Sequence, residues 1–280
     1  MTTLTVREVA VPALFYGTAW KEERTAGLVT QALEAGFRAI DTANQRKHYF
    51  EAAVGEAVAG WLAAGKGTRE QLFLQTKFTH VDGQDHRLPY DAGAGPAEQV
   101  AQSFASSLEH LQSSYVDSYV LHGPSLRDRL SNEDWQIWYA MCELERAGKT
   151  RLVGVSNVSL PQVLELCRDD GIKPAFVQNR CYARTGWDRE IREVCRAHGI
   201  GYQGFSLLTA NRRELAVPAV REMAARTGRT VPQLVFRFAL QVGMLPLTGT
   251  SDRAHMDEDL QSLGFELSDE DVAAIERVAG

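Results

Sequence analysis

The sequence predicts an α/β fold, a parallel eight-stranded (β/α)8 barrel that forms a single domain over residues 1–280. Three observations support this prediction. Eight short apolar runs alternate with stretches of helical period, which is the order of elements in such a barrel. Several runs lack a period-2 alternation, as expected for strands that are buried on both faces. No Gly/Ser/Pro-rich linker and no low-complexity segment divides the chain.

The predicted strands are short and rich in apolar residues. They cover 13–17, 37–41, 72–77, 116–121, 151–155, 174–178, 200–205 and 243–247. The helix over 96–112 begins with Pro96, whose missing N–H costs nothing in a first turn, and the helix over 133–147 stops before Gly148. Other helices are predicted near 22–35, 50–64, 159–168, 188–198, 219–227, 232–241 and 268–278. An open, doubly wound sheet is the alternative arrangement of these elements.

Composition and charge exclude several classes of protein. Hydrophobic residues make up 44% and charged residues 24% of the chain, which excludes a disordered chain, a collagen-like chain and a coiled coil. No apolar run reaches the roughly 20 residues that span a bilayer. Residues 1–15 lack the basic and apolar regions of a secretory signal. The net charge of −6 argues against a nucleic-acid binder.

Cysteine usage points to an intracellular protein without a metal site. The chain has four cysteines, Cys142, Cys167, Cys181 and Cys195. Their spacing contains no C-x-x-C pair and resembles neither a disulfide framework nor a zinc site. We therefore expect reduced thiols, a cytoplasmic location and no metal. We also expect a monomer or weak oligomer that binds neither nucleic acid nor membrane.

Three apparent motifs are interpreted as structural. Residues 199–204 match G-x-G-x-x-G, but they follow a predicted helix and precede a strand, the reverse of a dinucleotide-binding turn. Residues 60–67 approach a P-loop, but they lack its final Ser/Thr and follow a helix. The loop residues His80, Asp82, Asp85 and His86 are of metal-ligand type, but nothing in the loop fixes their geometry.

The carboxyl ends of the predicted strands carry the candidate functional residues, because chemistry in a barrel is located at these ends. The residues found there are Asp41, Lys77, His122, Ser156, Asn157, Gln178, Phe205, Gly249 and Thr250. Each alone has a structural explanation, such as a helix cap for Asp41 or a buried core histidine for His122. Together they predict a site.

Several stretches spread over nearly the whole chain resemble the aldo-keto reductase superfamily. They are FYGT (15–18), AIDTA (39–43), EAAVGEA (51–57), LFLQTKF (72–78), YVDSYVLHGP (115–124), AGKTRLVGVSN (147–157), FVQNRCY (176–182), GFSLL (204–208) and LTGTSDRAHMDEDL (247–260). The resemblance implies the (β/α)8, or TIM-barrel, fold. It also implies an NADPH-dependent oxidoreductase that reduces a small-molecule carbonyl substrate, an aldehyde or ketone, to an alcohol.

The resemblance implies four catalytic residues. Tyr49 is expected to donate a proton to the carbonyl oxygen, and His122 to orient the carbonyl by a hydrogen bond. A free tyrosine has a pKa of about 10, which the ammonium of Lys77, held by Asp41, is expected to lower. In the family the tyrosine lies five residues after the aspartate, where this chain has Arg46. Tyr49 is assigned because it is the only tyrosine of the segment; the alternative is an aromatic residue that packs at the helix start.

The resemblance also assigns residues to the two ends of the cofactor. Ser156, Asn157 and Gln178 match positions that hold the nicotinamide carboxamide, and Phe205 replaces a tyrosine that stacks on the ring. The remaining cofactor residues are expected to be Ser206, Leu208, Arg212, Gly249, Thr250, His255 and Asp259.

Three positions near the expected adenosine phosphate depart from the family. Gly249 replaces a usual lysine, His255 a usual arginine and Asp259 a usual asparagine. The carboxylate of Asp259 would repel a 2′-phosphate, whereas Arg212, Arg213 or Arg253 could compensate by attracting it. NADPH is the expected cofactor, with NADH as the alternative.

The substrate pocket is expected to include Trp20, Phe78 and Gly123, the last at a position where the family often has a tryptophan. An alternative function is that of a regulatory or non-catalytic member of the superfamily that binds the cofactor without turnover. The presence of Asp41, Lys77 and His122 together favours the enzyme.

Overall fold

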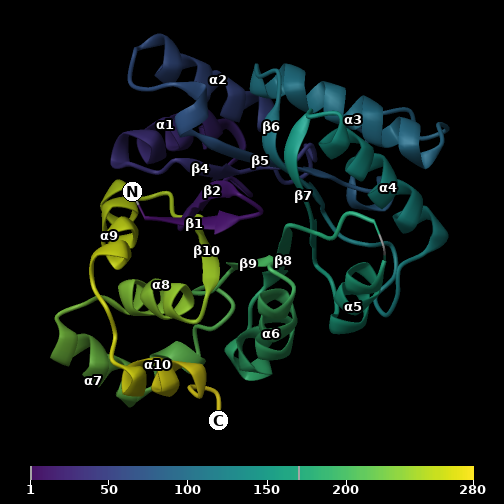
Figure 1. Ribbon diagram of the computed structural model, residues 1–280. Helices are drawn as coiled ribbons and strands as arrows, with labels where there is room; N and C mark the ends of the chain where they lie inside the picture. The colour runs from purple at the N-terminus through teal and green to yellow at the C-terminus, as the bar shows by residue number, and fades with distance from the viewer. Residues whose placement is uncertain (1, 170) are drawn as a thin grey trace.

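The computed structural model describes residues 2–169 and 171–280 and shows a closed barrel of parallel strands in the order β10-β3-β4-β5-β6-β7-β8-β9 (Figure 1). The strands are β3 (Phe15–Gly17), β4 (Ala39–Asp41), β5 (Phe73–Phe78), β6 (Val116–Leu121), β7 (Thr150–Ser156), β8 (Phe176–Arg180), β9 (Gly201–Phe205) and β10 (Met244–Thr248). The predicted (β/α)8 barrel is confirmed. The open sheet is excluded because β10 pairs with β3, with Leu247 opposite Phe15.

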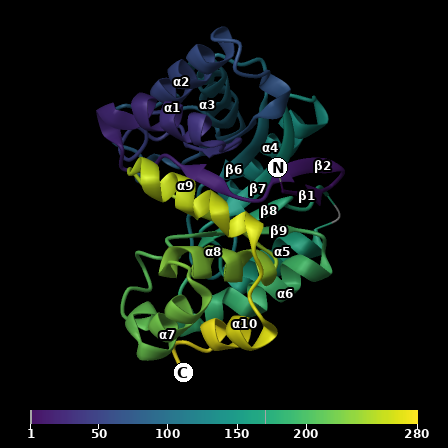
Figure 2. The same ribbon diagram turned by 90° about the vertical axis from the view of Figure 1, so that its left-hand side faces the viewer.

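Helices cover the outside of the barrel (Figure 2). They are α1 (Thr25–Ala35), α2 (Glu51–Ala63), α3 (Pro96–Leu111), α4 (Asn132–Arg146), α5 (Leu160–Arg168), α6 (Arg189–Ala197), α7 (Pro218–Thr227), α8 (Val231–Gln241), α9 (Arg253–Gln261) and α10 (Asp269–Glu276). Side-chain caps fix the first residues of several helices. Ser131 Oγ accepts from Asp134 N at 3.1 Å at the start of α4, and the Thr230 hydroxyl accepts from Gln233 N at the start of α8. In both views α9 lies between α1 and α8, and it contacts both.

An N-terminal hairpin, which the sequence pattern did not predict, closes one end of the barrel. Antiparallel strands β1 (Thr3–Val6) and β2 (Val9–Pro12) lie at the centre of the ring of helices in Figure 1. Val6 and Val11 are buried in a cluster with apolar residues from the amino-terminal parts of the barrel strands, among them Phe73 and Phe176. These two rings pack edge to face with their centroids 6.0 Å apart. The hairpin therefore seals the end opposite the candidate site.

Helices α2 and α3 pack unusually close together at one glycine. A Cβ built on Gly55 would lie 1.9 Å from the backbone oxygen of His110. Only hydrogen fits between the two backbones at this position. This contact fixes α2, whose first turn follows directly on Tyr49, against the helix behind it.

Two further features bear on the protein's class. Among the helices of residues 2–169 and 171–280, none has the length and hydropathy that crossing a membrane requires. All four cysteines are buried free thiols, and burial raises the pKa of Cys142, Cys181 and Cys195 to about 12. These thiols are therefore protonated and unreactive at neutral pH.

Candidate active site

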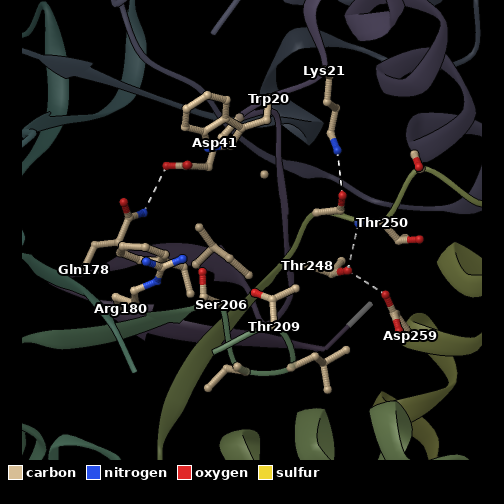
Figure 3. A pocket seen from close by; sticks show the side chains of 18 of the residues that line it. Trp20, Lys21, Asp41, Gln178, Arg180, Ser206, Thr209, Thr248, Thr250 and Asp259 are labelled. Atoms are coloured by element: carbon tan, nitrogen blue, oxygen red, sulfur yellow. Dashed lines mark hydrogen bonds between the residues drawn. The ribbon is translucent and has the colours of Figure 1, made fainter. Parts of the chain in front are cut away.

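A cavity of about 820 Å³ opens at the carboxyl ends of the barrel strands (Figure 3). Its volume falls within the range of small-molecule and cofactor sites. Many predicted site residues line it: Trp20, Asp41, Tyr49, His122, Ser156, Asn157, Gln178, Phe205, Ser206, Leu208, Gly249, Thr250, His255 and Asp259. The strand ends that were separate in the sequence thus face one space.

Lys77 lies directly beneath this cavity, in a buried ion pair with Asp41. The Lys77 side chain is 1% exposed, and its Nζ donates to both carboxylate oxygens of Asp41 at 2.7 Å and to Thr42 O at 2.8 Å. Burial lowers the pKa of Lys77, and the charge and hydrogen bonds of Asp41 oppose that shift. These acceptors match the three N–H donors of an ammonium, so no proton of Lys77 is left without a partner.

Buried glutamines hold the Asp41 carboxylate from the other side. Gln75 Nε2 donates to Asp41 Oδ1 at 2.7 Å, and Gln178 Nε2 donates to the same oxygen at 3.0 Å. Gln203 joins these two glutamines, because its Oε1 accepts from Gln75 at 2.8 Å and from Gln178 at 2.9 Å. The sequence analysis missed Gln75 and Gln203. Their signal was a polar residue in the middle of a buried strand, where no ligand position was expected.

The segment that carries Tyr49 is compact despite its extra length. Gln45 O accepts from both His48 N at 3.2 Å and Tyr49 N at 3.0 Å, so the chain turns tightly before α2. The Tyr49 ring consequently lies edge to face with His122 at 5.7 Å between centroids, and Lys77 Nζ lies 5.1 Å from the Tyr49 centroid. The altered spacing therefore still brings the tyrosine to the lysine and the histidine.

The pKa of Tyr49 moves in the direction opposite to the one predicted. Burial, followed by the negative charge of Asp41, raises the pKa of Tyr49 above its ordinary value of 10.0. The ammonium of Lys77 does not outweigh these two effects, because it is paired with Asp41. Tyr49 therefore keeps its proton at neutral pH, which is the state that a proton donor requires.

Glu51 anchors the chain just beyond Tyr49. Glu51 is buried at the start of α2, where its Oε2 pairs with His110 Nδ1 at 2.9 Å and its Oε1 accepts from the Thr76 hydroxyl. The hydrogen bond to Glu51 raises the pKa of His110. The pair ties the first turn of α2 to β5 and α3, which limits how far Tyr49 can move.

His122 is a neutral imidazole at the cavity wall. Burial is the largest cause that lowers the pKa of His122 to about 3, followed by the positive charge of Lys77. Its Nδ1 lies 2.7 Å from Thr79 Oγ1. When the Thr79 hydroxyl donates this bond, Nε2 carries the proton and can donate to an oxygen atom in the cavity.

The neighbouring strand ends provide a set of amide and hydroxyl groups. Ser156 Oγ donates to Gln178 O at 2.7 Å, and Asn157 Nδ2 donates to His122 O at 2.7 Å. Asn157 and Ser206 both have left-handed backbones, with φ of 53° and 58°, at the points where β7 and β9 enter their loops. These turns leave the hydroxyl and amide groups at the cavity surface beside Phe205.

The other end of the cavity lies between β3, β10 and α9. Lys21, which the sequence analysis missed, is only 4% exposed, and its Nζ donates to Gly249 O at 2.7 Å (Figure 3). Burial, with the nearby charge of Arg24, lowers the pKa of Lys21 to about 8. Lys21 lies in the turn after β3, in which Trp20 has a left-handed backbone. The sequence pattern gave no sign that this turn directs the Lys21 side chain inward.

A buried carboxyl group faces Lys21 across this end. Asp259 Oδ2 accepts from the Thr248 hydroxyl at 2.6 Å, and burial raises the pKa of Asp259 to about 6. Glu258 and His255 line the same wall. Near pH 7 the β10–α9 wall thus carries carboxylate charge, while Lys21 and Arg24 supply the positive charge of the cavity at this end.

Besides Lys77, three predicted residues do not line the cavity. Phe78 is fully buried and stacks on Tyr90 at 5.5 Å, because side chains alternate along β5 and Lys77 takes the inward direction. Gly123 packs next to Asn157. A Cβ added to Gly123 would lie 3.5 Å from the Cβ of Asn157. Arg212 is an exposed residue of the loop after β9 and is not part of the wall.

Trp20 and His48 form the outer rim of the cavity. Trp20 is 68% exposed, its ring lies 4.0 Å from that of His48, and its backbone N–H donates to His48 O at 2.7 Å. Across the cavity, Arg180 lies at the end of β8 beside Gln178. Neither His48 nor Arg180 was assigned to the site from the sequence.

The donor set fits a nicotinamide dinucleotide. Hydroxyl and amide groups of Ser156, Asn157 and Gln178 complement a carboxamide at one end. Lys21 and the hydroxyl groups of Thr250 and Ser251 complement phosphates at the other end. The loops after the last two barrel strands are also the usual phosphate site of this fold.

Comparison with known proteins agrees with this geometry. Residues 14–279 match the model of the Aldo/keto reductase family. The chain is 30% identical to deoxymugineic acid synthase 1-D of Triticum aestivum, over 93% of this chain and 85% of that protein. It is 29% identical to the glyoxal reductase of Bacillus subtilis (strain 168), over 89% of this chain and 81% of that protein. A crystal structure of an aldo/keto reductase from Brucella melitensis superposes with a TM-score of 0.83 at 25% identity over 99% of both chains. The chain belongs to the aldo/keto reductase family.

Proposed function

We propose that this protein reduces an aldehyde or ketone to an alcohol with a nicotinamide dinucleotide as reductant. Family membership supports carbonyl reduction in general. The observation that carries the specific proposal is the grouping of Tyr49, His122 and the Asp41–Lys77 pair at one end of the cavity. The other end of that cavity offers groups suited to phosphates.

Each catalytic residue has a distinct task in this proposal. The cofactor supplies the hydride that the carbonyl carbon receives. Tyr49 donates its proton to the carbonyl oxygen as negative charge develops there. Neutral His122 donates a hydrogen bond to the same oxygen. Lys77, held by Asp41, places positive charge beneath the tyrosine ring and stabilises the phenolate that remains after proton transfer.

We further propose that NADPH and NADH both fit, with residues of the β10–α9 wall deciding between them. Ser156, Asn157 and Gln178 would hold the carboxamide, and Phe205 would stack on the ring. Lys21 and Thr250 would hold phosphate groups that both cofactors share. The sequence analysis favoured NADPH from the family resemblance, and Arg212, one residue expected to attract the 2′-phosphate, lies outside the cavity wall.

A direct test combines cofactor binding with turnover. Quenching of protein fluorescence by NADPH and by NADH gives the two dissociation constants. A panel of aldehydes and ketones is then added, and oxidation of the reduced cofactor is followed by absorbance. Carbonyl-dependent oxidation with either cofactor supports the proposal. Tight binding without turnover across the panel would contradict it and would favour a regulatory role.

A further inference from the structure

Arg180 places a guanidinium group at the mouth of the cavity. It lies two residues beyond Gln178 on β8, so both side chains point to the same face of the strand. A strand rises about 3.3 Å per residue, which puts Arg180 roughly 6–7 Å nearer the opening than Gln178. Its register partner on β9 is Phe205, which also lines the cavity. Figure 3 shows Arg180 beside Gln178, on the side away from Lys21 and Asp259.

None of the residues that the structure describes neutralises the charge of Arg180. Within residues 2–169 and 171–280, no carboxylate comes within ion-pair distance of it and no acceptor bonds it. The carboxylate of this end of the cavity, Asp41, already accepts from Lys77, Gln75 and Gln178. Glu258 and Asp259 line the opposite end. The reacting end of the cavity is therefore positively charged.

Some other arginines of the fold are paired with carboxylates. Arg192 pairs with Glu276 at 2.7 Å, and Arg46 pairs with Glu23 at 3.0 Å. His48, on the rim across from Arg180, has its pKa lowered by burial and by Lys47. His48 therefore supplies a neutral imidazole, and Arg180 supplies the permanent positive charge.

We propose that Arg180 binds a carboxylate on the substrate, so that the preferred substrates are oxo acids, with the Trp20–His48 ring pair covering the rest of the molecule. The inference rests on the proposed carbonyl reduction and names its substrate class. A guanidinium matches a carboxylate with two parallel hydrogen bonds, which a neutral aldehyde cannot form. The carboxylate itself is unchanged in the reaction.

The experiment compares 2-oxo acids with their methyl esters, which differ mainly in charge. In the wild-type protein we expect kcat/KM to be about tenfold or more higher for the acid than for its ester. Arg180→Gln should remove this preference, mainly by raising KM for the acid, and leave the ester within about twofold. Arg180→Lys keeps the positive charge but loses the paired N–H donors of the guanidinium. Its preference for the acid should therefore lie between those of the wild type and Arg180→Gln. Exposed Arg221 on α7 provides the matched control, Arg221→Gln, which should change nothing.

Cofactor binding separates the two sources of anion that could reach Arg180. The dissociation constants of NADPH and NADH, measured by fluorescence quenching, should be unchanged in Arg180→Gln. Weaker binding of both cofactors, with equal losses for acid and ester, would assign the guanidinium to the cofactor phosphates and overturn the inference. Equal rates for acid and ester in the wild type would also overturn it. Cofactor binding without reduction of any carbonyl compound would instead refute the proposed function, and this inference with it.

Discussion

At the scale of single residues, the catalytic group could be predicted and its electrostatics could not. Asp41, Lys77 and His122 were predictable because each lies at the end of a barrel strand or within one residue of it, where side chains converge. The pKa of Tyr49 was predicted in the wrong direction, because the sequence does not show how deeply the tyrosine is buried, and burial is the largest cause of the rise. Lys21 was missed for a similar reason: its inward direction depends on a left-handed turn at Trp20.

The first prediction concerns Tyr49 itself. Tyr49→Phe removes the hydroxyl and leaves the ring, so packing against His122 is retained. General acid catalysis by a positioned side chain contributes roughly 10²–10⁴-fold, and kcat should fall by that factor. The dissociation constant of the cofactor should stay within about twofold, as measured by fluorescence quenching. A variant with near wild-type kcat would exclude Tyr49 as the proton donor.

The second prediction concerns Asp259 and the choice of cofactor. At pH 8 the Asp259 carboxyl, with a pKa of about 6, is ionised and adds to the charge of Glu258. Asp259→Asn keeps the shape and removes the charge, so kcat/KM should improve by about tenfold for NADPH and little for NADH. The ratio of the two values, measured with one carbonyl substrate, tests this.

The pH dependence of that ratio provides the control. Protonation of Asp259 removes the repulsion, so discrimination against NADPH should weaken as the pH falls through about 6. His255, Glu258 and Thr248 face the same carboxyl and stay in place in the variant. The 2′-phosphate of NADPH also titrates near pH 6. Because Asp259→Asn lacks the carboxyl group, its pH profile gives the contribution of the 2′-phosphate alone. Identical pH profiles for the two proteins would be inconsistent with a role for Asp259.

At the scale of elements, the periodicity of the sequence was sufficient to predict the barrel but not the hairpin that covers its amino-terminal end. All the predicted strands form, because buried apolar runs of five or six residues are distinctive when helices separate them. The β1–β2 hairpin was missed because it stands outside that alternation and half of its residues face solvent. Phe78 was misassigned because it belongs to β5, where side chains alternate, and Lys77 next to it takes the inward direction.

The third prediction tests the close packing of α2 on α3. Gly55→Ala would place a Cβ 1.9 Å from the backbone oxygen of His110, which cannot move without shifting α3. Overpacking of this kind costs about 1–3 kcal/mol, and the free energy of unfolding should fall accordingly in urea titrations. Gly60 on the same helix has open space around its Cβ position. Gly60→Ala should therefore stabilise the protein by about 0.5–1 kcal/mol, and equal effects of the two substitutions would disprove the packing argument.

At the scale of the whole molecule, the hairpin and the cavity give the barrel two different ends. Aromatic and aliphatic packing closes the amino-terminal end, around Phe73 and Phe176. Polar and charged groups, most of them satisfied by one another, line the carboxyl end. Stability is thus concentrated away from the site, and the site is free to carry the buried charges of Lys77 and Lys21. This division predicts that ligand binding at the open end stabilises the entire fold.

The fourth prediction follows from that coupling. A cofactor that binds only the folded chain at 100 times its Kd adds about 2.7 kcal/mol to the free energy of unfolding. For a chain of this size we expect the Tm to rise by roughly 5 °C. Lys21→Met should reduce this rise, because the buried ammonium that faces the cavity is lost. Lys149→Met, at an exposed position outside the cavity, is the matched control and should leave the rise unchanged.

The pH dependence of the thermal shift distinguishes an electrostatic role of Lys21 from a packing role. The pKa of Lys21 is lowered to about 8 in the free protein, so the ammonium loses its proton as the pH rises through that value. Bound phosphates would raise the pKa again, and binding above pH 8 must then take up a proton. The cofactor-induced rise in Tm should therefore shrink between pH 7 and pH 9 in the wild type, and it should stay constant in Lys21→Met. A rise that is independent of pH in both proteins would mean that Lys21 supports the cavity by packing against Tyr16 and Gly249, and that its charge does not contribute to cofactor binding.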